Sequence, residues 1–257
     1  KLNISKYNVV GDWQSDPANE QSIVSQVGGR AETRYAWAQD SWQLARDWKA
    51  VLGLRWEDWT ASQGHTATAS SQLNYAQRSE SHFSPKAALA YQLTSNTTLK
   101  ASLGRAVRFP TVGELYGATS GGALSFINDP NLRPEKSVTT EFSIERDVGT
   151  GLWRTTLFAE NTRDALYSQT AFDPAANLNI SRVQNIDKIG TTGLEATLAT
   201  TDWWLKGLDL SGSVTYTDSK IKANAGFVST AGDTIGKWQP NIPRWRATAL
   251  AAYRFSE

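Results

Sequence analysis

Apolar and polar residues alternate one by one through several stretches of this chain. Successive side chains of a β-strand point to opposite faces, so this pattern predicts a sheet with one apolar and one polar face. It recurs near residues 83–93, 138–147, 208–217 and 245–255. In the clearest stretch, Leu208, Leu210, Gly212, Val214 and Tyr216 alternate with Asp209, Ser211, Ser213, Thr215 and Thr217. No helical or heptad period competes with it, so we expect an all-β fold.

Turn-forming residues divide the chain into about ten strands joined by connections of alternating length. Short connections lie near residues 47, 95–96, 148–151 and 204–207, and longer ones near 11–29, 62–79, 109–135, 170–177 and 223–242. Alternating short and long loops are typical of outer-membrane barrels. The pattern therefore predicts a transmembrane antiparallel up-and-down β-barrel. The expected strands are 1–10, 30–46, 48–61, 80–94, 97–109, 136–148, 151–169, 178–202, 207–222 and 243–256.

The composition agrees with such a barrel. Mean hydropathy is −0.44, and no apolar run approaches the ~18 residues of a transmembrane helix. Barrel strands keep mean hydropathy low because lipid-facing and lumen-facing residues alternate. The chain has 11 Trp and 8 Tyr, as expected for aromatic girdles at two membrane interfaces. Surface aromatics also occur on carbohydrate-binding sandwiches, so a soluble all-β module stays open on composition alone.

Composition also excludes several kinds of chemistry. There is no cysteine, which rules out thiol catalysis, disulfides and cysteine metal sites, and the net charge of +1 points to no nucleic-acid partner. No Gly-x-Ser-x-Gly element or phosphate-binding loop is present. His65 and His82 could meet across a long hairpin and bind a metal, but two polar loop residues explain them as well. We therefore predict no catalytic residue, no metal site and no cofactor.

Residues 104–145 carry the most specific short motifs of this chain. Further motifs lie before and after this stretch. The motifs are Arg108-Phe109-Pro110, Glu114-Leu115-Tyr116 and Leu132-Arg133-Pro134-Glu135, with Gln39-Asp40-Ser41-Trp42, Gly53-Leu54-Arg55, Ser84-Pro85-Lys86 and Gly193-Leu194-Glu195 around them. The ordered set resembles TonB-dependent outer-membrane receptors, specifically the C-terminal part of their β-barrel. One departure is Asp129-Pro130, where the family often has Gly-Asn-Pro.

The resemblance implies what the whole protein does. Residues 1–257 would be about ten strands of a larger, 22-stranded barrel, with the plug domain, the first strands and the last hairpin outside this chain. Such a receptor imports a scarce nutrient with energy from TonB, delivered through the plug. The expected partners are a ferric siderophore or similar metal chelate, TonB and outer-membrane lipid. Haem, cobalamin and oligosaccharides remain open as substrates.

Arg108, Tyr116 and Arg133 are the candidate ligand-binding residues, in an extracellular vestibule. Guanidinium and phenol groups suit anionic or catecholate-like chelates, through charge-assisted hydrogen bonds and stacking. The structural alternative is that these residues shape the exit of a strand, where Pro110 ends the ladder. Both interpretations can hold together.

Two other functions fit parts of the pattern. A passive outer-membrane pore or an adhesin barrel would have the same strands without a plug. A soluble all-β carbohydrate-binding module would have the same aromatic content without a lipid-facing surface. In none of these cases do we expect an enzyme.

Overall fold

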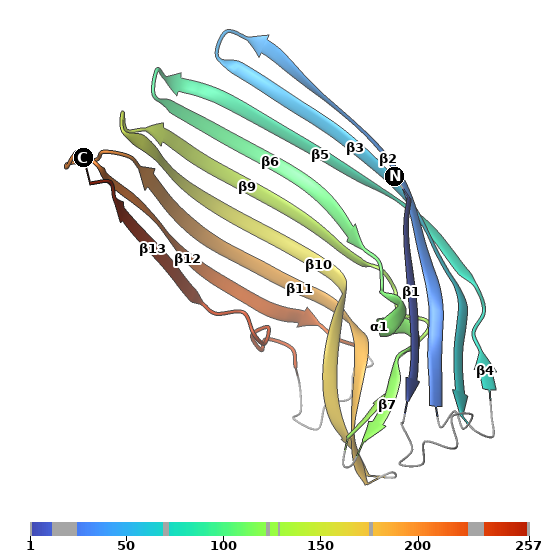
Figure 1. Ribbon diagram of the computed structural model, residues 1–257. Helices are drawn as coiled ribbons and strands as arrows, with labels where there is room; N and C mark the ends of the chain where they lie inside the picture. Colours follow the sequence, from blue (N-terminus) through green and yellow to red (C-terminus); the bar gives the residue numbers. More distant parts are fainter. Residues whose placement is uncertain are drawn as a thin grey trace.

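The computed structural model of this protein describes residues 2–11, 25–68, 72–121, 124–127, 129–174, 177–225 and 234–255. It is almost entirely β-structure, with thirteen strands in one sheet and one short helix in the described ranges. Figure 1 shows the strands as one tall curved wall, with the short turns gathered at one end. The sheet does not close into a barrel, because β1 and β13 are its two edges.

Ten strands form the wall, and each pairs antiparallel with its neighbours in sequence order. All ten correspond to predicted strands, so the up-and-down topology is confirmed. In order they are β1 (Leu2–Gly11), β2 (Ser25–Ala45), β3 (Trp48–Thr68), β5 (Arg78–Thr94), β6 (Thr97–Arg108), β9 (Glu135–Asp147), β10 (Gly151–Asp173), β11 (Leu178–Thr200), β12 (Leu208–Ala223) and β13 (Trp245–Tyr253).

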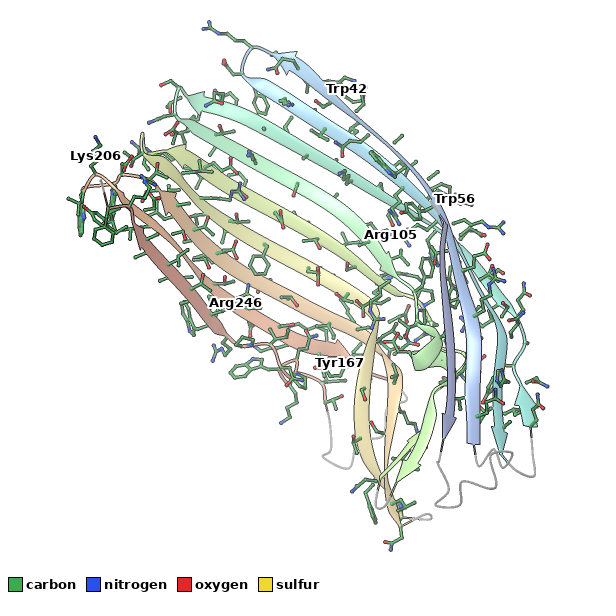
Figure 2. All side chains as sticks on the ribbon, in the orientation of Figure 1. Trp42, Trp56, Arg105, Tyr167, Lys206 and Arg246 are labelled. Carbon is green, nitrogen blue, oxygen red and sulfur yellow. The ribbon has the colours of Figure 1, made fainter. Side chains whose placement is uncertain are left out.

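The register places apolar and polar residues in separate rows on opposite faces. One row, from β6 to β13, runs Ala101, Phe142, Leu157, Leu194, Tyr216 and Trp245. The adjacent row on the other face runs Lys100, Ser143, Thr156, Glu195, Thr215 and Arg246. We call the first side the outer face and the second the lumen face, since barrels in membranes turn their apolar side to lipid. Figure 2 shows side chains on both sides of the wall, with Arg246 labelled on β13.

Several predicted loops are shorter than expected, and one contains secondary structure. β3 continues to Thr68 and β10 to Asp173, so the predicted loops at 62–79 and 170–177 were too long. Strand residues in these stretches are mostly polar on both faces, which removes the alternation that reveals a strand. The predicted loop 109–135 holds α1 (Val112–Tyr116), β7 (Ala118–Gly121) and β8 (Leu124–Ile127). A fourth short element, β4 (Gln72–Asn74), pairs with β3.

All five predicted long connections lie partly outside the described residues, at 12–24, 69–71, 122–123 with 128, 175–176 and 226–233. With five residues, α1 is far too short to cross a membrane, and no other described segment is a helix.

Candidate functional site

The chain turns from β6 into α1 through a capping box. Thr111 has extended backbone angles, φ −75° and ψ 161°, and its side chain accepts a hydrogen bond from the Glu114 backbone N–H at 3.2 Å. The Glu114 carboxylate in turn accepts from the Thr111 backbone N–H at 2.8 Å. This reciprocal pair satisfies two N–H groups that a helix start leaves free. The Thr111-x-x-Glu114 spacing was visible in the sequence and could have predicted the helix.

Arg108 is joined to α1 by the same carboxylate. Its Nη1 and Nη2 donate to the two oxygens of Glu114 at 3.1 and 2.8 Å, a fork-on-fork pair. Partial burial alone would raise the pKa of Glu114. The hydrogen bonds from Arg108 and Thr111 outweigh that effect, so the pKa of Glu114 lies below its ordinary value.

The Glu114 contacts predict a pH dependence. A carboxyl whose pKa is lowered in the folded state stabilises it above the ordinary pKa, and that stabilisation is lost as pH falls through the lowered value. Below about pH 4 we therefore expect faster hydrogen exchange in residues 112–116 of the intact receptor, after correction for intrinsic exchange. Glu114→Gln should already exchange fast at neutral pH and show no such step. Identical pH profiles for the two proteins would contradict this role.

The apolar side of α1 packs onto the lumen face of β2 and β3. Val112, Leu115 and Tyr116 are buried there, with Tyr116 only 2% exposed. The strands contribute the small residues Ala31 and Ala61 and the side chain of Trp59; Leu132 and Leu166 complete the cluster, which we call the α1 cluster. The helix is thus a fixed part of the lumen wall.

Two glycines make room for Tyr116. A Cβ on Gly29 would lie 2.6 Å from the Tyr116 ring, and one on Gly64 would also fall inside its van der Waals envelope. Tyr75 stacks on the ring, with the centroids 5.3 Å apart. The phenol is therefore enclosed by backbone and a second ring, and burial raises its pKa. A ligand in the lumen would reach it only after α1 moved.

Arg133 sits where the returning segment rejoins the wall. Its backbone N–H donates to the Asn185 side chain at 2.8 Å, and the Asn185 amide donates back to the Arg133 carbonyl at 2.9 Å. Its Nη2 lies 2.9 Å from Asp164 and 3.4 Å from Asp187. The side chain is nevertheless 56% exposed. Among the described residues, the Arg133 Nε and Nη1 have no hydrogen-bond partner.

The three candidate residues thus lie on one segment but in different settings. Arg108 is held by Glu114, Tyr116 is buried, and Arg133 is half exposed beside two aspartates. No contact joins one of these three side chains to another in the described part of the chain. They share the wall around α1, and only the two arginines present polar groups to the lumen.

Arg78 was missed by sequence reasoning. Its Nη1 donates to the carbonyls of Pro130 and Leu132 at 2.8 and 2.9 Å, and its Nη2 pairs with Glu80 at 2.8 Å. It therefore ties the segment before β9 to β5. These bonds join residues 52 and 54 positions apart in the sequence. Such contacts depend on strand register, which no short sequence motif reveals.

The two histidines are not brought together. His82 lies directly opposite Glu57 on β3, whereas His65 lies eight residues further along β3. At about 3.3 Å per residue that separates them by roughly 26 Å. His82 lies 3.2 Å from Glu80, and His65 contacts the Gln63 carbonyl. No group of three or more metal-ligating side chains occurs within the described ranges.

An antiparallel wall with an apolar outer face and a polar lumen face has the construction of one side of a membrane-spanning β-barrel. A family model described as TonB dependent receptor-like, beta-barrel matches residues 3–257. The chain belongs to that family and lies in the outer membrane, as predicted.

Relatives and solved structures agree with this assignment. The iron-regulated outer membrane virulence protein of Vibrio cholerae serotype O1 is 29% identical over 182 residues, 65% of this chain and 27% of that protein. The probable TonB-dependent siderophore receptor PiuA of Acinetobacter baumannii is 24% identical over 237 residues, 87% of this chain and 29% of PiuA. The ferric-catecholate import receptor Fiu of E. coli K12 superposes with a TM-score of 0.64 at 18% identity, covering 91% of this chain and 33% of Fiu. The chain therefore spans less than a third of the curated relatives it matches.

Proposed function

We propose that this chain is one wall of an outer-membrane receptor that takes up a scarce nutrient, with a ferric siderophore or similar metal chelate as its substrate. Membership of the family supports uptake, and the siderophore receptor named among the relatives supports the substrate class. In this proposal TonB delivers the energy through a plug domain outside the chain.

One structural observation carries the proposal. The segment between β6 and β9 packs α1 onto the lumen face, and its short strand β8 pairs with β11. Arg133 supports the proposal because its side chain is more than half exposed and its Nε and Nη1 have no described partner, so they could donate to an anion. Asp164 and Asp187 contact only its Nη2. Arg108 is a weaker candidate because Glu114 occupies both of its terminal nitrogens. Tyr116 would contribute through the position of α1.

The other candidate functions are less well supported. Nothing in the structure favours a passive pore or an adhesin over a receptor, and the family assignment argues against both. The apolar outer face and the outer-membrane family overturn the soluble carbohydrate-binding module. A receptor of this family works by binding and gating, so no bond-making chemistry is proposed.

The ligand proposal is tested in the intact receptor with Arg133→Gln. The backbone bonds to Asn185 remain, but a neutral side chain replaces the cation. A charge-assisted contact contributes about 1.5–3 kcal/mol, so affinity for an anionic chelate should fall roughly tenfold or more. The measurement is titration of candidate ferric siderophores on cells, normalised to folded receptor.

Tyr116→Phe is the matched control, because it keeps the buried ring and removes only the hydroxyl. It should leave affinity unchanged. If Arg133→Gln also binds the parent's ligand with full affinity, Arg133 is scaffold and not part of the ligand site.

A further inference from the structure

A row of cations lies on the outer face, across three adjacent strands. Lys136 of β9 is directly opposite Arg163 of β10, which is directly opposite Lys188 of β11. Their side chains share a face with the apolar row of Phe142, Leu157 and Leu194, because strand residues an even number apart point the same way. We call Lys136, Arg163 and Lys188 the outer cation row.

Two further cations adjoin this row. Lys222 is the extra residue of a bulge opposite Lys188, and its side chain lies over Gly190, where an added Cβ would be 3.1 Å from its Cε. Arg105 of β6 lies on the same face opposite Val138, two residues along β9 from Lys136. Figure 2 labels Arg105 at the lower part of β6, near α1. The row is thus the centre of a wider basic patch.

The charges of the row are largely unneutralised by the protein. Only Lys136 approaches a carboxylate, Asp164, at 3.8 Å; Arg163, Lys188 and Lys222 have no ion pair among the described residues. On the lumen face, by contrast, Lys100 and Arg154 both contact Glu145. Like charges directly opposite on neighbouring strands destabilise a sheet. An anion from outside the chain would remove that repulsion.

The row lies at the depth of lipid headgroups. Twelve residues separate Arg163 from Gly151, the first residue of β10, and the same number separates Lys188 from Thr200 at the end of β11. At about 3.3 Å per residue and a tilt of about 40°, this is roughly 30 Å along the membrane normal. The apolar band of such barrels is about 25 Å tall. The cations therefore stand just beyond it, on the side of the long connections.

We propose that the outer cation row, with Lys222, binds the phosphate of a lipid in the outer leaflet. A phosphate monoester carries about −1.5 to −2 charges and several acceptor oxygens, which match a fork from Arg163 flanked by lysines. The acyl chains of the same lipid would reach Phe142, Leu157 and Leu194, six residues and roughly 20 Å further along the same strands. A free phosphate would use only the cations, so contact with this apolar band distinguishes a lipid from a free phosphate.

The test uses the intact receptor in detergent and the double variant Arg163→Gln/Lys188→Gln. The probe is bisphosphorylated lipid A, compared with its dephosphorylated form and with inorganic phosphate. The parent should bind the phosphorylated lipid at least about tenfold more tightly than the double variant. Its binding should weaken as salt is raised. Arg246→Gln, which removes an exposed cation from the lumen face, should bind like the parent.

Two measurements guard against misfolding and against other ligands. Arg163→Lys/Lys188→Arg keeps both charges and should retain most of the lipid affinity. On the unaltered receptor, dephosphorylated lipid A should bind much more weakly and millimolar inorganic phosphate should compete poorly. Equal binding of both lipid forms, or strong competition by inorganic phosphate, would overturn the proposal. Full affinity in the double variant would also overturn it, and would indicate an acidic protein partner for the row instead.

Discussion

Replacing Val214 with lysine should prevent the barrel from assembling in the outer membrane. Val214 lies on the outer face of β12, directly opposite Ala196 and Ala247, and is 48% exposed in this chain. Six residues separate it from Leu208, where β12 begins, which places it about 15 Å above the short turns, near the middle of the apolar band. A cation at that depth costs about 2–4 kcal/mol.

Ser213→Lys is the matched control, one residue away on the lumen face. Ser213 lies opposite Thr197 and Thr248, and its hydroxyl is 2.7 Å from that of Thr248. A lysine there meets a polar surface, so its effect should be milder. The measurement is the heat-modifiable folded fraction of full-length receptor in outer membranes. Equal loss at the two positions would mean that β12 does not separate a lipid face from a lumen face.

The wall itself was predictable because burial in lipid imposes a strict two-residue period. Where that period holds, as in β12 and β13, both the strands and their faces were predicted correctly. It fades where strands leave the membrane, and there the ends of β3 and β10 were missed. The short turns were found because they carry local turn residues.

The surroundings of the candidate site were not predictable, because they depend on contacts between distant segments. Local motifs identified Arg108, Tyr116 and Arg133 as candidates. They did not reveal that Gly29 and Gly64 enclose the phenol. Nor did they reveal that two aspartates, Asp164 and Asp187, flank Arg133. Such pairings follow from strand register. Only the capping box of α1 is a local signal that went unused.

Gly64→Ala should loosen α1 from the lumen face, which is the second large effect that we expect. The added methyl group would overlap the Tyr116 ring, which is buried and stacked on Tyr75, so the ring has little room to yield. Overpacking of this kind costs about 1–3 kcal/mol. If the strain falls on α1, its undocked population should rise by roughly 5- to 150-fold.

Gly104→Ala is the matched control for this experiment. Gly104 also lies on the lumen face, on β6, but its added Cβ would meet only the Lys86 side chain, at 3.9 Å. Limited proteolysis of folded receptor, followed at sites within 109–134, should therefore accelerate in Gly64→Ala and not in Gly104→Ala. Combining Gly64→Ala with Tyr116→Ala should add little to the cleavage rate of Tyr116→Ala alone, because the clashing ring is gone. Fully additive rates would show that Gly64 acts through β3 itself and that the enclosure of Tyr116 does not hold α1 on the wall.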